Sequence, residues 1–98
     1  MDILKEGTIY RLENYSSNGN QELVFTERVE SGYRAGTTNE EVVNVLIDRF
    51  YHLQKNNFSA ENQCIILLLK NVRRMLAKRL NRKIGNVKKY NEQTSTPT

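Results

Sequence analysis

The segment from residue 36 to residue 83 constrains this chain most, because it predicts a helical hairpin whose second arm is basic. Thr38 and Glu41 have the spacing of a capping box, in which each side chain satisfies a free amide at a helix start, so a helix is predicted to begin at Asn39. This helix is predicted over about residues 39–55. Its apolar positions recur at steps of three and four residues: Val43, Leu46, Ile47, Phe50 and Leu53.

A second helix is predicted over about residues 60–84, with Ser59 as its N-cap and Gly85 as a left-handed C-cap. Its expected buried stripe comprises Ile65, Leu68, Leu69, Val72 and Leu76. At about 100° per residue, Arg79 and Lys83 fall on this same stripe. Because a buried, unpaired charge is costly, two interpretations stay open. Either the two cations lie at an exposed or ion-paired helix end, or they form a site for a negatively charged ligand.

The first part of the chain predicts short strands. Residues 7–13 and 22–29 alternate between apolar and polar side chains, residues 33–35 could add a third strand, and Asn18-Gly19 is a strong hairpin-turn signal. Together these elements predict an α+β fold: a small N-terminal antiparallel β-sheet, over about residues 7–35, followed by an antiparallel two-helix hairpin. We expect one domain over residues 1–85 and a disordered polar tail over residues 86–98.

Composition limits both the core and the chemistry. With 98 residues, 38% of them hydrophobic, and no tryptophan, a monomer would have a thin core, so we expect self-association. The single cysteine excludes an internal disulfide, and the single histidine argues against a zinc site; Cys64 is expected to be a buried apolar filler. No cofactor is expected. Without a signal peptide or an apolar run long enough to cross a bilayer, we expect a soluble intracellular protein.

Charge is divided unevenly along the chain. Residues 1–61 hold six basic and ten acidic side chains, a net charge of −4, whereas residues 62–98 hold nine basic and one acidic, a net charge of +8. The basic block could be a solvated face, an intersubunit partner of the acidic half, or a trap for phosphates. A nucleic-acid-binding or protein-interaction module is therefore an alternative function. Against nucleic acid, Lys70, Arg74, Lys78 and Arg79 point in widely different directions.

No catalytic arrangement is evident, so we do not expect an enzyme; anion binding is what the residues support. Arg79, with Lys83 one turn on, could present two cations to a diphosphate. Asn62 could pair with a base edge, or only solvate the first helical turn. His52 and Phe58 could stack on a base, or be a surface residue and a plug for the hairpin corner. Because Asn62 and Arg79 lie far apart in one hairpin, a site that uses both needs a second subunit.

Several segments together resemble a known family. They are Glu22-Leu23-Val24-Phe25, the run from Gly36 to Val42, Leu46-Ile47-Asp48-Arg49, Leu53, Phe58, Glu61-Asn62, Leu69, Leu76 and Arg79. In these segments the chain resembles the phage Thoeris anti-defence sponge proteins of the first described type. Their helical hairpin is similar to that of the sponges that block CBASS defence. The resemblance covers roughly residues 8–83.

The resemblance implies a function. Such proteins bind cyclic ADP-ribose isomers, and some also bind cyclic trinucleotides, without cleaving them, so that the defence effector stays silent in the cytoplasm of the infected bacterium. They assemble as dimers or hexamers with pockets between subunits; neither a membrane nor nucleic acid is implied as a partner. The implied ligand-binding residues are His52, Phe58, Asn62, Arg79, Lys83, Thr38, Asn39 and Arg49.

The chain also departs from the family pattern. Lys83 stands where an arginine is expected, and His52 stands where a larger aromatic ring is expected. Lys70 and Asn71 replace an acidic pair, and Met75 replaces a tryptophan. A more basic second helix could change the assembly or the range of ligands.

Overall fold

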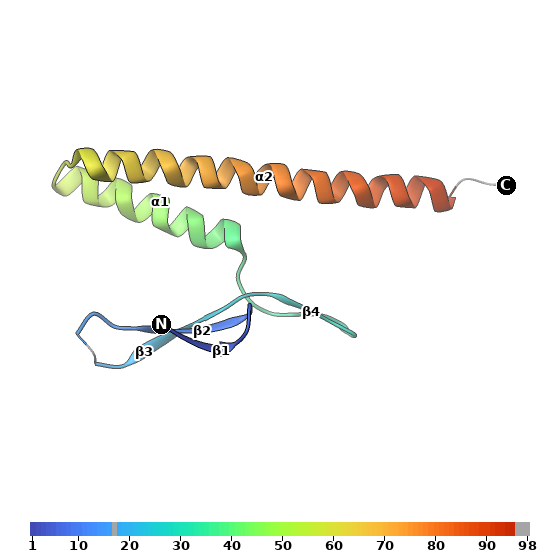
Figure 1. Ribbon diagram of the computed structural model, residues 1–98, viewed down its shortest axis with the longest axis horizontal. Coiled ribbons are helices and arrows are strands. Elements are labelled where there is room, and N and C mark those ends of the chain that lie inside the picture. Colours follow the sequence, from blue (N-terminus) through green and yellow to red (C-terminus); the bar gives the residue numbers. More distant parts are fainter. Residues whose placement is uncertain (17, 96–98) are drawn as a thin grey trace. The chain divides into compact units, whose positions relative to one another are not determined.

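The structure is a computed structural model that describes residues 1–16 and 18–95, and the side chains of residues 1–16 and 18–85. Its contacts divide between two compact units, Met1–Val42 and Val43–Thr98. An N-terminal antiparallel β-sheet precedes two helices, which confirms the predicted α+β fold class (Figure 1). The predicted self-association stays a prediction.

The first unit contains a three-stranded sheet in the order β1-β2-β3, formed by Asp2–Lys5, Ile9–Glu13 and Asn20–Val24. The β2–β3 hairpin pairs Ile9 with Val24 at one end and Glu13 with Asn20 at the other. Gly19, with φ of 87°, closes this hairpin in a left-handed conformation that suits glycine, in the predicted Asn-Gly turn. Strand β1 was not expected from the sequence.

A second, two-stranded hairpin pairs β4 (Glu27–Val29) with β5 (Gly32–Arg34). The single strand predicted over residues 22–29 is therefore wrong in extent, because the chain leaves the first sheet after Val24. At that point Thr26 N donates to Thr37 O at 2.9 Å and Thr37 N donates to Val24 O at 2.8 Å. These bonds to a distant segment replace the ladder that a continuous strand would have made.

The core of the first unit is small. Thr8 is its buried polar residue, at 8% exposure, and the Thr8 carbonyl accepts a 2.8 Å hydrogen bond from Phe25 N. Tyr10 and Phe25 are half-buried and meet edge to face, with ring centroids 6.0 Å apart at 88°. This geometry is favoured by the aromatic quadrupole and links strand β2 to the segment that follows β3.

Helix α1 spans Asn39–Asn56, so its predicted start is confirmed. Glu41 N donates to Thr38 Oγ1 at 3.2 Å, and Val42 N donates to Thr38 O at 3.2 Å. Thr38 therefore acts as the N-cap that the capping-box spacing predicts. The observed end of the helix lies one residue beyond the predicted one.

Helix α2 spans Ala60–Ser95 and begins where predicted. Ser59 is its N-cap, since Asn62 N donates to Ser59 Oγ at 3.3 Å. The predicted end at residue 84, with Gly85 as a C-cap and a disordered tail from residue 86, is wrong. Gly85 lies inside the helix and is not among the glycines with positive φ, and the helix continues to Ser95. Residues 96–98 of the predicted tail lie outside the described residues.

The two helices run antiparallel, side by side, and α2 extends well past α1 (Figure 1). Ile47 and Ile66 are the buried hydrophobic residues of this hairpin, at 5% and 1% exposure. Polar contacts between α1 and α2 are spread along the hairpin. Gln54 Nε2 donates to Gln63 Oε1 at 3.3 Å, Arg73 Nη1 donates to Asn44 Oδ1 at 3.3 Å, and Lys70 Nζ lies 5.0 Å from the centre of the Tyr51 ring.

The predicted buried stripe of α2 is wrong in part. Ile65, Leu69 and Leu76 are half-buried, but Leu68 is 63% exposed and Val72 is 46% exposed. The most buried side chain is Ile66, which was not assigned to the stripe. The side of α2 that packs on α1 is therefore rotated away from Leu68 and Val72, and these two side chains belong to an exposed apolar face.

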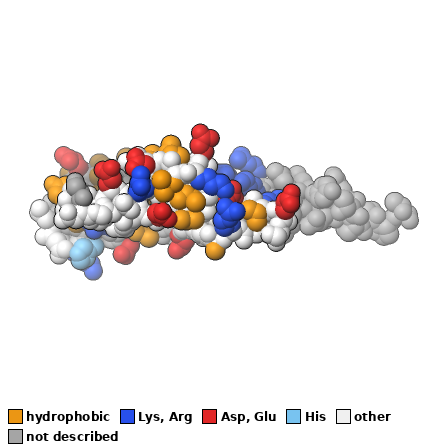
Figure 2. Space-filling model, turned by 90° about the horizontal axis from the view of Figure 1, so that it is seen from below, with side chains coloured by type: hydrophobic (Ala, Val, Ile, Leu, Met, Phe, Trp, Pro, Cys, Tyr) orange, Lys and Arg blue, Asp and Glu red, His pale blue; other side chains and the backbone are white. Residues whose placement is uncertain are grey.

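Large hydrophobic side chains are exposed in both units, and Figure 2 shows exposed hydrophobic groups interspersed with charged ones on one face of the molecule. Within the residues that the structure describes, no helix has the length and apolarity needed to cross a membrane.

Candidate functional site

The hairpin corner presents two of the predicted ligand-binding residues. Gln54 orders this corner, because its Oε1 accepts a hydrogen bond from Ser59 N at 2.8 Å. Asn62 is half-buried in the first turn of α2. Phe58 is 73% exposed, so the interpretation that it plugs the corner is wrong, and its ring is accessible for stacking.

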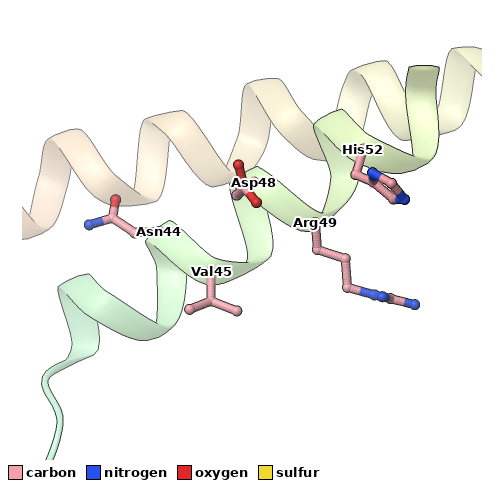
Figure 3. A pocket seen from close by; sticks show the side chains of 5 residues that line it. All are labelled: Asn44, Val45, Asp48, Arg49 and His52. Atoms are coloured by element: carbon pink, nitrogen blue, oxygen red, sulfur yellow. The ribbon is translucent and has the colours of Figure 1, made fainter.

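A shallow depression on α1 brings together His52 and Arg49, both predicted as ligand-binding residues. We call it the α1 depression; it has a volume of about 530 Å³ and is lined by Asn44, Val45, Asp48, Arg49 and His52. Figure 3 shows these five side chains projecting from successive turns of the helix. The sequence interpretation missed Asp48 and Asn44. They lie four and eight residues before His52, which places all three along one side of a helix.

His52 has a local partner. Asn56 Nδ2 lies 3.1 Å from His52 Nε2, one helical turn away. Which of the two groups donates in this contact depends on the tautomer of the imidazole. The exposed ring therefore remains free to stack, while one of its nitrogens is already engaged.

A second depression lies on the exposed apolar face of α2. We call it the α2 depression; it has a volume of about 580 Å³ and is lined by Leu68, Asn71, Val72, Met75, Leu76, Lys78, Arg79 and Arg82. Leu68, Val72 and Met75 follow one another at steps of four and three residues and are 63%, 46% and 59% exposed. The same spacing continues to Arg79 and Arg82, so an apolar strip ends in two guanidinium groups.

The α2 depression contains one member of the predicted cation pair, Arg79 and Lys83. Arg79 lines the α2 depression, and so does a second guanidinium, that of Arg82; Lys83, the predicted second cation, does not line it. Both Arg79 and Lys83 are exposed, so neither is a buried charge. In the protomer Arg79 and Lys83 are therefore exposed, as the first interpretation expected. An exposed position does not conflict with the second interpretation, an anion site.

The cations of α2 lie in a segment of the helix that has no acidic residues. The sequence from residue 62 to residue 91 contains no Asp or Glu. The contacts of the neighbouring cations on α2 are to neutral groups: Arg73 to Asn44, Arg74 Nη2 to Asn71 Oδ1 at 3.0 Å, and Lys70 to the Tyr51 ring. These contacts leave the positive charge of the three side chains uncompensated by a carboxylate.

One protomer does not bring all the predicted residues together. Asn62 and Arg79 are 17 residues apart on α2, which corresponds to about 25 Å along the axis. Thr38 and Asn39 belong to the N-terminal unit, and the Thr38 hydroxyl is engaged as the α1 N-cap. The contribution of Thr38 and Asn39 to a ligand site stays a prediction.

Cys64 is exposed, which corrects the expectation that it fills the core. Within residues 1–16 and 18–95, no group of three or more His, Cys, Asp or Glu side chains is placed to hold a metal ion.

Comparison of the chain with protein-family models, with curated protein sequences and with solved structures finds no match.

Proposed function

We propose that this protein binds and sequesters a small cyclic nucleotide signal of the cyclic ADP-ribose type, without cleaving it. The observation that carries the proposal is the α2 depression, where exposed Leu68, Val72 and Met75 adjoin the guanidinium groups of Arg79 and Arg82. A cyclic ADP-ribose isomer combines a base with an apolar face and a diphosphate, so its two parts match the two parts of this surface.

Arginine suits the diphosphate end. The planar guanidinium presents five donors and forms bidentate, charge-assisted hydrogen bonds with phosphate oxygens. Arg79 and Arg82 are three residues apart, so their side chains emerge on neighbouring positions of one helix. A cyclic trinucleotide carries the same chemical groups and is the second ligand class to test.

Binding without cleavage is supported by the lining. Among the described residues that line the α2 depression, none carries a carboxylate, an imidazole, a thiol or a hydroxyl. Hydrolysis of a diphosphate or a glycosidic bond needs a group that activates water or protonates the leaving group. The cations and the amide of this lining are suited to holding a phosphate ligand.

A second copy of the chain completes the pocket in this proposal. One helix face covers only one side of a ligand, whereas tight small-molecule sites bury most of the ligand surface. An antiparallel pairing of two α2 helices, centred on Val72, buries the exposed Leu68, Val72 and Met75 side chains. In this pairing Arg79 faces Ile65 of the partner subunit, because Arg79 and Ile65 are equally distant from Val72 in sequence. Asn62 of the partner subunit neighbours that Ile65 on the helix surface, so it also comes near Arg79.

Charge favours the antiparallel arrangement over the parallel one. The cations of α2 all lie at or beyond Lys70, and Glu61 lies in its first turn. Parallel helices would place like charges side by side, whereas antiparallel helices place the basic part of one against the acidic start of the other. A dimer of this kind is the simplest assembly, and a hexamer could be built from three dimers.

The biological role proposed for this activity is phage anti-defence. Holding the signal in the cytoplasm of the infected bacterium would keep the Thoeris effector inactive. This part rests on the resemblance of the capping segment at residues 36–42, Asn62 and Arg79 to the sponge family.

Calorimetric titration with cyclic ADP-ribose isomers tests the proposal. We expect tight binding by the wild type, and at least about 100-fold weaker binding by Arg79→Ala, since charged hydrogen-bond partners of phosphate contribute this order of free energy. Lys55→Ala removes an exposed cation of α1 that lines neither depression, and should bind like the wild type.

Two further readouts complete the test. Heating the complex should release the ligand unchanged in mass and retention time; a cleaved product would make the protein an enzyme. Val72→Glu should abolish both the oligomer, measured by sedimentation, and ligand binding. Absence of binding to every isomer and to cyclic trinucleotides would overturn the proposal.

A further inference from the structure

We propose a second binding surface on α2, which shares Lys78 and Arg82 with the α2 depression and extends beyond it, and which binds the phosphodiester backbone of a nucleic acid without sequence preference. The surface is a row of four exposed cations at steps of four residues: Lys70, Arg74, Lys78 and Arg82. We call this row the cationic ridge. It does not depend on the proposed sponge function.

The spacing of the ridge is regular. Residues four apart are neighbours on a helix surface, separated by about 6 Å along the axis and turned by about 40°. The ridge therefore extends over about 18 Å from Lys70 to Arg82 and winds gradually around the helix. A regular series of positive charges of this length matches a regular series of phosphates better than it matches a single small anion.

The ridge keeps its charge. Intrahelical ion pairs require a carboxylate three or four residues away, and α2 contains none from residue 62 to residue 91. Lys70 lies over the Tyr51 ring at 5.0 Å, and Arg74 donates to Asn71 Oδ1 at 3.0 Å. Both partners are neutral and leave the cationic groups exposed.

Arg79 points in a different direction from Lys70, which is why the cations of α2 do not all lie on one stripe. Arg79 belongs with Leu68 and Val72 in the α2 depression. Arg82 also lines that depression, but it continues the four-residue spacing of Lys70, Arg74 and Lys78, so these four cations form one continuous row. That row is the feature that the sequence interpretation overlooked.

Two other partners fit the ridge less well. A membrane surface requires a continuous apolar face beside the cations, but the strip of Leu68, Val72 and Met75 is followed by Arg79 at the next position of the same spacing. An acidic surface of a second copy is partly occupied, because in the N-terminal unit Asp2 pairs with Arg11, and Glu27 pairs with Lys5 and Arg34.

Fluorescence anisotropy with the full chain tests the inference. The probes are a labelled single strand of about 20 nucleotides and a duplex of the same length, at salt concentrations from about 50 to 200 mM. Four phosphate contacts predict a slope of log K against log salt of about −3 for the single strand and about −3.6 for the duplex. Binding of either probe with such a slope supports the ridge, and the stronger probe identifies the form that it prefers.

A charge-matched pair of variants locates the site. Lys70→Gln with Arg74→Gln removes two ridge cations that do not line the α2 depression, and should reduce the magnitude of the slope by about 1.4 for the single strand. Arg28→Gln with Lys55→Gln removes the same charge from exposed positions off the ridge and should leave the slope unchanged. Circular dichroism checks that both variants are folded.

Three outcomes would overturn the inference: no binding of either probe at the lowest salt, equal losses in the two double variants, or binding to phosphatidylserine vesicles in place of oligonucleotides. Failure here is distinguishable from failure of the sponge proposal. Arg79→Ala should affect the small cyclic ligand and not the salt slope, whereas the Lys70 and Arg74 double variant should do the reverse.

Discussion

Gly36 lies so close to Phe25 that a Cβ atom on Gly36 would be 2.4 Å from the Phe25 carbonyl carbon. The next nearest atoms, Thr26 N at 2.5 Å and Phe25 O at 2.7 Å, also belong to the backbone and cannot rotate away. Gly36→Ala must therefore push apart two segments that are joined by the hydrogen bonds of Thr37. We expect a loss of about 3 kcal/mol in the free energy of unfolding of the N-terminal unit, as for other overpacked sites.

Urea unfolding, followed by the near-ultraviolet signal of the tyrosines, would measure this change. Ser31→Ala adds no bulk at an exposed turn position and is the matched control. An unchanged midpoint for Gly36→Ala would mean that the two segments are not in close contact.

At Gly85, by contrast, an alanine is expected to raise the stability of the protein. Gly85 lies inside α2, no atom beyond the adjacent backbone of its own helix lies within 4 Å of the position that a Cβ would occupy, and its φ is not positive. Gly85→Ala should therefore stabilise the helix by about 1 kcal/mol, because glycine is a poor helix former. Far-ultraviolet circular dichroism at 222 nm should show more helix and a higher melting temperature. A left-handed C-cap at this position would give the reverse, since alanine is strained there.

The helix starts were predictable because the interactions that define them are local. Thr38 and Ser59 accept hydrogen bonds from amides three residues ahead, and such bonds depend only on residue type and spacing. The end of α2 was not predictable in this way. A glycine near a polar sequence is compatible with a cap and with a continuing helix, and Gly85 has the second conformation.

The orientation of α2 was misjudged for a physical reason. Ile65, Ile66, Leu67, Leu68 and Leu69 are consecutive, and five consecutive residues at about 100° each cover every side of a helix. Periodicity cannot then decide which of them is buried. Packing on α1 decides it, in favour of Ile66.

The break after Val24 is likewise non-local. Residues 22–29 alternate as one strand would, but the approach of Gly36 and Thr37 diverts the chain at Phe25. Arg79 was predicted as an anion-site residue from its place on an apolar stripe, whereas Arg82, which lines the same depression, was not, because the four-residue spacing pointed to Lys83.

Ile66 and Leu68 form a matched pair for testing the orientation of α2. Ile66 is 1% exposed and Leu68 is 63% exposed, although they are two residues apart. Ile66→Ala should cost about 3 kcal/mol, the usual loss for a buried isoleucine, whereas Leu68→Ala should cost less than about 0.5 kcal/mol in a dilute monomer. Urea unfolding at low protein concentration measures both. Equal losses would contradict the observed burial, and a Leu68 effect that grows with protein concentration would reveal a self-associating face.

The dependence of stability on pH should reside partly in Glu27. Lys5 Nζ donates to Glu27 Oε2 at 2.8 Å and Arg34 Nη1 donates to the same oxygen at 3.2 Å. The hydrogen bond from Lys5 is the main cause that lowers the pKa of Glu27 below its ordinary value of 4.5, against an opposing effect of burial. A carboxyl whose pKa is lower in the folded state stabilises that state above the unfolded pKa and loses this contribution as pH falls through the folded pKa.

The N-terminal unit should accordingly weaken as pH drops below about 4.5, and Glu27→Gln should flatten this part of the profile. Urea midpoints measured between about pH 3 and pH 6 test it, with the exposed Glu22→Gln as control. The profile of the control should follow that of the wild type. If the profile of Glu27→Gln also followed that of the wild type, the hydrogen bonds from Lys5 and Arg34 would not lower the pKa of Glu27 in the folded state.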